Sequence, residues 1–333
     1  MLTTYRNFAL TTALSLAMIG MAGTGAVQAQ AQQGKKIAYF QNGPNNPYTS
    51  RMMNAFVDQA KTHGMETTVF PTNFDPALQA QQIDDAIAQK FDLLALMPVG
   101  AETVIPPLIR AKAAGIPVII VNTEMKPGSE ELYMSFVGER SVEMGELAGK
   151  AMAEVLKASG RKTAKIVLLT GPLTENVVAQ RVDAIKAALA ATPEYQIVAM
   201  EDVKWDMANA ERVAGQHYAR FAPEGGIDLI YGMADNVAIG AIRAAEASGQ
   251  SLGTGPEQLI VMGGACQPPG IEMLKSGKSY ATGIQIPQRT GRVAADLAND
   301  HFNGKTLEHD YVQEVATVTL DNLPEWEERC SWK

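Results

Sequence analysis

Short apolar runs of β type alternate with longer amphipathic stretches along nearly the whole chain, and this alternation constrains the fold more than any other feature of the sequence. The runs lack the polar alternation of a sheet with one wet face, so they are typical of strands buried on both faces. The first four runs cover residues 37–40, 66–70, 92–97 and 118–121. Helical periodicity separates them. The pattern predicts parallel sheets flanked by helices, an α/β fold.

The βα pattern occurs twice. A first series covers residues 37–121 and a second covers residues 165–262, each with about four predicted strands. Two similar α/β lobes follow from this repetition. Ligands of open α/β sheets bind beyond the carboxyl ends of the strands, so the loops after the strands are the candidate functional segments.

Charge and motif content exclude several classes of function. The 333-residue chain has 28 Lys+Arg and 36 Asp+Glu, a net charge of -8, which provides no basic surface for nucleic acid. The sequence contains no phosphate loop, no G-x-S-x-G nucleophile turn, no H-E-x-x-H zinc helix and no C-x-x-C pair. We therefore expect no catalytic residues, no metal, no cofactor and no nucleic-acid partner. The four histidines are expected on helix surfaces or near the C-terminal end: His63, His217, His301 and His309.

The N-terminus has the three parts of a secretory signal peptide. Arg6 precedes an uncharged apolar stretch over residues 8–22, and small residues follow with possible cleavage after Ala29 or Ala31. No later stretch reaches the roughly 18 apolar residues of a membrane span. Residues 1–31 are therefore predicted to be a signal peptide, and the mature protein is expected to be soluble and exported.

Four segments resemble one known family in the same order along the chain. They are IAYFQNGPNNPY (37–48), AGIPVIIVN (114–122), ADNVAIGAIRAA (234–245) and ATGIQIP (281–287). Together they resemble the ribose/galactose-type periplasmic sugar-binding proteins of ABC importers. The resemblance extends over essentially the whole mature chain.

The resemblance implies a type I periplasmic binding protein fold, in which two Rossmann-like lobes are joined by a hinge of three crossings. The first lobe would combine residues 33–137 with 286–314, and the second 138–285 with 315–333. By similarity, the protein would be a monomeric, non-enzymatic periplasmic receptor that captures a sugar, polyol or similar small hydroxylated solute for an ABC permease. Other possibilities are a ligand sensor for a chemoreceptor or kinase, a binder of an amine or nucleoside, and an exported α/β enzyme.

The resemblance also assigns ligand-binding residues. Tyr48 and Trp205 would stack on the apolar face of a sugar ring, although Tyr48 could simply pack under its loop. Asn46 and Gln285 would each pair with neighbouring hydroxyls, and Asp235 would bind ligand or cap a helix. The full set is Asn42, Asn46, Tyr48, Asn122, Thr123, Trp205, Asp235 and Gln285.

Several positions depart from the family pattern. Asn122-Thr123 stands where the family commonly has Asp-Arg, and Ala179 where it has a ligand arginine, so Arg181 is expected to be a structural cation. A pocket without those charged groups favours a smaller or partly apolar solute. Carboxylates or amides without an obvious opposing cation are expected on the rim, which keeps an amine ligand as an alternative: Glu124, Glu175, Asn176 and Asp235.

The two cysteines, Cys266 and Cys330, both map to the second lobe. An oxidising compartment favours their pairing, and two buried free thiols are the alternative. A disulfide would place Trp326 and Trp332 near the back of that lobe.

Overall fold

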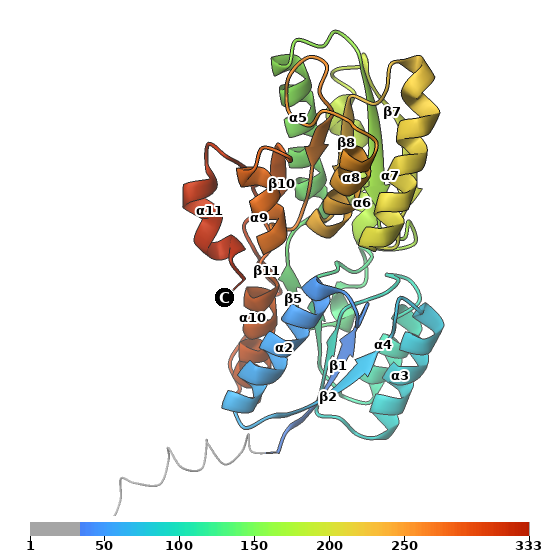
Figure 1. The fold of residues 1–333 in the computed structure, drawn as a ribbon. Coiled ribbons are helices and arrows are strands. Elements are labelled where there is room, and N and C mark those ends of the chain that lie inside the picture. Colours follow the sequence, from blue (N-terminus) through green and yellow to red (C-terminus); the bar gives the residue numbers. More distant parts are fainter. Residues whose placement is uncertain (1–33, 333) are drawn as a thin grey trace, which may run out of the picture.

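The computed structural model describes residues 34–332, and the signal peptide predicted for residues 1–31 lies outside them. Figure 1 shows two lobes stacked one above the other, each built on a central sheet with helices on its faces. The predicted α/β architecture with two lobes is confirmed. None of the helices in this part of the chain has the length and apolar content needed to cross a membrane.

The lower lobe in Figure 1, the first lobe, contains a six-stranded parallel sheet with the order β11-β5-β4-β3-β1-β2. Its strands are β1 (Lys36–Gln41), β2 (Glu66–Pro71), β3 (Leu93–Leu96), β4 (Val118–Val121), β5 (Ser135–Gly138) and β11 (Asp310–Val312). Its helices are α2 (Pro47–Thr62), α3 (Pro76–Ala88), α4 (Ile105–Ala113), α10 (Pro287–Phe302) and the short 3-10 helix η1 (Glu130–Leu132).

The second lobe contains a six-stranded sheet with the order β12-β10-β9-β8-β6-β7, in which only β12 is antiparallel to its neighbour. Its strands are β6 (Ala164–Thr170), β7 (Tyr195–Asp202), β8 (Leu229–Gly232), β9 (Ile260–Met262), β10 (Ala281–Gly283) and β12 (Thr317–Thr319). Its helices are α5 (Ser141–Ala158), α6 (Asn176–Leu189), α7 (Met207–Phe221), α8 (Asp235–Ala247), α9 (Pro268–Lys275), α11 (Leu323–Cys330) and the 3-10 helix η2 (Ala222–Glu224).

Each sheet has six strands rather than the predicted four or so. The additional strands are β5 and β11 in the first lobe and β10 and β12 in the second. β10 lies in a further β-type run at residues 281–286, which predicts a strand there. The other three were not predicted: β5 has four residues and β11 and β12 have three each, too few to produce a periodic apolar pattern in the sequence.

The chain passes between the lobes three times: from β5 to α5, from β10 to α10, and from β11 to β12. The connecting segments are residues 139–140, 284–286 and 313–316, and together we call them the hinge. Because all three lie beside one another at the junction of the sheets, small backbone rotations in a few residues could change the angle between the lobes.

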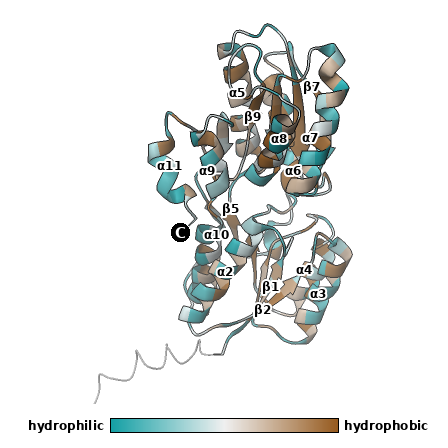
Figure 2. Ribbon diagram, viewed as in Figure 1, coloured by the Kyte–Doolittle hydropathy of each residue, from teal (hydrophilic) through white to brown (hydrophobic). Residues whose placement is uncertain are grey.

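Strand side chains pack into helices on both sheet faces. In β1, Ile37 and Tyr39 belong to one apolar cluster, whereas Ala38 and Phe40 belong to another. Figure 2 shows the same arrangement, with apolar strands inside and more hydrophilic helix surfaces outside. This two-sided burial explains why the strands are continuous apolar runs in the sequence.

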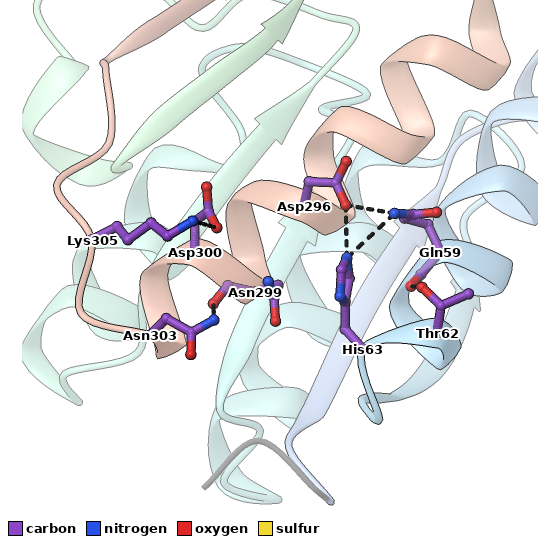
Figure 3. A network of polar contacts seen from close by, with 8 residues as sticks. All are labelled: Gln59, Thr62, His63, Asp296, Asn299, Asp300, Asn303 and Lys305. Atoms are coloured by element: carbon purple, nitrogen blue, oxygen red, sulfur yellow. Dashed lines mark hydrogen bonds and ion pairs between the residues drawn. The ribbon is translucent and has the colours of Figure 1, made fainter. Parts of the chain in front are cut away.

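Helix α2, which begins at the ligand-facing edge of the first sheet, is held along its length by α10. A Cβ at Gly291 would lie 2.1 Å from the Met52 carbonyl oxygen, so glycine permits the close approach of the two helices. At the far end of α2, His63 Nε2 lies 2.7 Å from Asp296 Oδ1, and Gln59 donates to the same oxygen at 2.6 Å (Figure 3). These contacts fix the helix whose first turn contributes to the candidate site.

One expectation about the histidines is wrong. His217 is buried, with 5% of its surface exposed, because it lies on the inner face of α7 together with Val213, Tyr218 and Phe221. Its Nε2 atom lies 3.2 Å from a carboxylate oxygen of Glu201. His217 occupies an inward-facing position of the amphipathic helix α7, where its ring lies beside the carboxylate of Glu201 on β7.

Candidate ligand-binding site

A cleft lies between the carboxyl ends of the two sheets and encloses about 500 Å³ of unfilled space, part of it open to solvent. Every lining segment follows a strand, as expected for ligand sites in open α/β sheets. The lining residues are Asn46, Tyr48, Thr49, Phe74, Met97 and Asn122 from the first lobe, Glu175, Val177, Arg181, Trp205, Met233, Ala234, Ala265 and Gln267 from the second, and Gln285 from the hinge.

Of the residues assigned from the sequence, Asn46, Tyr48, Asn122, Trp205 and Gln285 line this cleft. The remaining three lie outside its lining. These three are Asn42, Thr123 and Asp235.

Asn46 and Asn42 organise the first-lobe wall. The Asn46 side-chain oxygen accepts hydrogen bonds from the Tyr48 and Thr49 backbone amides at 2.8 and 3.4 Å and so caps α2. Asn42 is fully buried, and its side-chain oxygen accepts from the Phe74 backbone amide at 3.1 Å. Asn42 therefore supports the turn that carries Phe74 and does not itself line the cleft.

A hydrogen-bonded chain of side chains crosses from the first lobe to the hinge. The Tyr48 hydroxyl donates to Asn122 at 2.8 Å, and the Gln285 amide donates to the Tyr48 hydroxyl at 3.3 Å. The same amide lies 3.4 Å from Glu139, a carboxyl that is 2% exposed. Burial raises the pKa of Glu139 above its usual range. Glu139 was not singled out in the sequence because it lies in the two-residue hinge segment after the short strand β5.

Two aromatic residues occupy matching turns in the two lobes. Phe74 follows β2 and Trp205 follows β7, and both adopt left-handed backbone conformations, with φ of 61° and 56°. Each directly precedes an aspartate that caps the next helix, Asp75 or Asp206. Both rings line the cleft and its outer entrance. Phe74 was missed, although the repeated aromatic-Asp pair after the second strand of each lobe is visible in the sequence.

Arg181 lines the cleft, which corrects its expected role as a purely structural cation. It lies four residues after Val177 in α6, so both side chains project from the same helix face. The guanidinium is buried, with 6% of the residue exposed, and its Nε atom has no hydrogen-bond partner among residues 34–332. The cleft therefore contains a buried cation with unused donor capacity.

Glu175 is a buried carboxyl in the wall of the cleft. It precedes α6 and is 5% exposed, and the Trp205 indole N–H donates to its two oxygens at 3.2 and 3.3 Å. Burial raises the pKa of Glu175 to about 8, even though the Trp205 donor and nearby Arg181 lower it. No ion pair joins Glu175 to a cation within residues 34–332.

Glu124, unlike Glu175, pairs with a cation, Arg140, which was not recognised as its partner from the sequence. Arg140 lies 2.6 Å from one of its oxygens. The Glu124 carbonyl oxygen accepts a hydrogen bond from the Asn176 side chain of the second lobe at 3.1 Å. This contact joins the two lobes across the mouth of the cleft.

A model of the periplasmic binding protein domain matches residues 37–306. The chain belongs to the periplasmic binding protein family. Among characterised proteins, it is 27% identical to the xylitol-binding protein of Mycolicibacterium smegmatis over 79% of this chain and 71% of that protein. It is 24% identical to the ribose import binding protein of Bacillus subtilis over 79% of this chain and 80% of that protein. The crystal structure of a galactofuranose binding protein superposes with a TM-score of 0.80 at 19% identity, covering 88% of this chain and 97% of that one.

Asp235 and Thr123 lie behind the cleft of this periplasmic binding protein. Asp235 is 2% exposed and accepts hydrogen bonds from the Gln267 backbone amide at 2.5 Å and the Thr282 hydroxyl at 2.6 Å. It is the first residue of α8, whose N-cap is Ala234, so the expected capping role is wrong. Asp235 is also absent from the residues that line the cleft. Thr123 is 2% exposed and contacts the Asn122 side chain. Both residues support neighbours that line the cleft.

The C-terminal segment of the binding protein reaches the hinge. The structure joins Cys266 to Cys330, with Cα atoms 5.2 Å apart. Trp332 lies against the first lobe and not at the back of the second: its indole N–H donates to the Gln285 carbonyl oxygen at 3.3 Å, and its ring packs edge-on against Tyr48. Arg51 donates to the Trp332 carbonyl oxygen at 3.0 Å. The expected placement was wrong because the two residues after Cys330 turn towards the hinge.

Proposed function

We propose that this periplasmic binding protein captures a sugar, polyol or similar small hydroxylated solute between its lobes for an ABC importer. The observation that carries the proposal is a strand-end cleft lined by Phe74 and Trp205 from different lobes, with amide and charged side chains between them. Aromatic rings stack on the C–H face of such solutes, while polar side chains pair with their hydroxyls. The relatives named for xylitol and ribose support this class of ligand.

The proposed mechanism is ligand-stabilised closure. A ligand held by residues of both lobes favours the closed arrangement over the open one by its difference in affinity for the two. The hydrogen bond between Asn176 and the Glu124 carbonyl oxygen would form only when the lobes are closed. The permease then recognises the closed form. The protein carries out no reaction on the ligand in this mechanism, so the ligand is released chemically unchanged.

We propose that the moving units are residues 33–137 with 286–314 and residues 138–285 with 315–333. The crossings at 139–140, 284–286 and 313–316 support this division. Trp332 is an exception, because it packs on the first lobe. We further propose a monomer in the periplasm whose exported form begins at Gln30 or Gln32, which N-terminal sequencing of the secreted protein would test.

The deciding experiment is a thermal-shift panel on the mature protein, followed by calorimetry. The panel contains pentoses, hexoses and polyols, with nucleosides and amino acids for comparison. A saturable rise in melting temperature with one hydroxylated compound is expected, because a ligand that binds only the native state stabilises it. A micromolar dissociation constant would correspond to about 8 kcal/mol. A response to nucleosides or amino acids alone would contradict the proposal.

A further inference from the structure

The buried charges around the cleft do not balance. Among residues 34–332, one buried cation, Arg181, lines the cleft, while Glu175 and Glu139 are buried carboxyls with 5% and 2% of their surfaces exposed. A third buried carboxyl behind the cleft, Asp235, receives hydrogen bonds from Gln267 and Thr282. Arg181 forms no ion pair with either carboxyl within residues 34–332. If both carboxyls were ionised, the site would hold an excess negative charge away from water, which is strongly unfavourable without a compensating cation.

Glu175 has hydrogen-bonding capacity that the protein does not use. An ionised carboxylate accepts about four hydrogen bonds. From residues 34–332 Glu175 receives one donor, the Trp205 indole N–H, shared between its two oxygens. A hydroxyl could donate one further bond. A protonated amine would donate up to three and would also supply the missing positive charge.

The surroundings of Glu175 suit an organic cation. The Trp205 indole N–H bonds to Glu175, and the Trp205 and Phe74 side chains both line the cleft, so aromatic surface is available close to the carboxylate. Much of the remaining wall is apolar and offers few partners for a ring of hydroxyls: Met97, Val177, Met233, Ala234 and Ala265. The cleft therefore combines one anionic point with stacking surfaces and a limited number of polar groups.

We infer that the ligand carries a protonated amine that pairs with Glu175, so that the solute is an amino polyol or amino sugar. This inference rests on the proposed function and specifies its ligand class further. In the ligand-free site Glu175 holds a proton, which satisfies one oxygen without a cation. When the ammonium group binds, Glu175 releases its proton to solvent. The positive charge of the ligand then balances the negative charge of the carboxylate.

The test compares matched ligands by calorimetry on the mature protein: sorbitol with 1-amino-1-deoxysorbitol, and xylitol with 1-amino-1-deoxyxylitol. We expect the amine of at least one pair to bind at least about 30-fold more tightly than its parent at pH 8, a gain within the range of a desolvated charge pair. The Glu175→Gln variant keeps an oxygen for the Trp205 N–H but cannot ionise, so it should lose this preference. Glu194→Gln, at an exposed position of the second lobe outside the cleft lining, should retain it.

The pH dependence provides a second measurement. Because the pKa of Glu175 is raised to about 8, its ionised fraction increases from about 1% at pH 6 to about one half at pH 8. An alkylammonium like that of lysine, with a pKa of about 10.4, stays protonated over this range. The affinity for the amine should therefore rise on the order of 50-fold from pH 6 to pH 8. The parent polyol should show no such rise, and Glu175→Gln should abolish it for the amine.

The outcomes separate this inference from the proposed function. If a parent polyol binds as tightly as its amine and neither affinity rises with pH, the amine inference is wrong and the proposed function stands. If no polyol, sugar or amine binds while a nucleoside or amino acid does, both are wrong. The melting temperatures of Glu175→Gln and the wild type without ligand should agree within a few degrees, which excludes unfolding as the cause of a lost preference.

Discussion

The two lobes repeat one βα plan but build different walls for the cleft. In the first lobe the polar groups are largely bonded to one another: Asn46 caps α2, and Tyr48 bonds to Asn122. In the second lobe, considering residues 34–332, Arg181 has an Nε without a hydrogen-bond partner and Glu175 has one shared donor. The polar groups of the first-lobe wall are therefore held in place by hydrogen bonds to one another. The second-lobe wall has charged groups that remain available to bind a ligand. We expect chemical selectivity to depend more on the second lobe than on the first.

The lobes also differ in how their cleft loops are held. The second-lobe loop after β9 carries Ala265 and Cys266 in left-handed conformations, with φ of 78° and 46°. Hydrogen bonds to Asp235 and the bond from Cys266 to Cys330 fix this loop. The first lobe contains no cysteine, so its loops depend on hydrogen bonds and packing.

Removal of the disulfide should have the largest effect. Closing a loop of 64 residues is expected to stabilise the folded state by about 4 kcal/mol on the chain-entropy estimate. Cys330→Ser should therefore unfold at a markedly lower urea concentration than the wild type. Dithiothreitol should destabilise the wild type to the same level and leave the variant unchanged. A wild type that is indifferent to reductant and titrates two thiols would contradict the pairing.

Loss of the Arg181 cation should have the next largest effect, on binding. Arg181→Met leaves Glu175 and Glu139 without their nearby positive charge and removes donors from the cleft, which should weaken ligand binding about 100-fold, or close to 3 kcal/mol. Calorimetry with the ligand found in the panel would measure this. Lys186→Met, on the exposed side of the same helix, is the matched control and should bind normally. An unchanged affinity in Arg181→Met would show that Arg181 does not contribute to ligand binding and has only a structural role.

The two aromatic residues test the contrast directly, because they occupy equivalent turns. Trp205→Ala should weaken binding about 30-fold, or about 2 kcal/mol, since it removes a stacking face and the donor to Glu175. Phe74→Ala removes a stacking face alone and should cost about fivefold, or about 1 kcal/mol. Dissociation constants from calorimetry would compare them. A larger loss for Phe74→Ala would reverse the proposed difference between the lobes.

The fold could be predicted from sequence because its main signal is local. Continuous apolar runs and helix periodicity reveal most strands and helices, and the family resemblance places Trp205 and Gln285 after strand ends. Arg181 was misplaced because the facing side of α6 depends on helix phase, which an error of two residues inverts. Phe74 was missed because a single residue in a turn between a strand and a helix has no periodic signal of its own.

Other features depend on long-range packing and leave no local pattern. The position of Trp332 follows from a bond between residues 64 positions apart and from the way the chain turns after it. Asp235 is buried under a loop that approaches from another part of the chain, and its partners Gln267 and Thr282 are 32 and 47 residues away. Sequence periodicity reports which face of an element is buried but does not report which distant polar group it meets.

The smallest effect should come from the first-lobe hydroxyl that completes the hydrogen-bonded chain to the hinge. Tyr48→Phe keeps the ring against Trp332 but removes the donor to Asn122 and the acceptor for Gln285. Asn122 and Gln285 would then lose part of their orientation before ligand arrives, and the affinity should fall about fivefold, or about 1 kcal/mol. Tyr133→Phe, in the same lobe but outside the cleft lining, is the control and should bind as the wild type does. If Tyr48→Phe lost as much affinity as Arg181→Met, the first-lobe wall would bind the ligand directly through this hydroxyl. Selectivity would then not depend more on the second lobe than on the first.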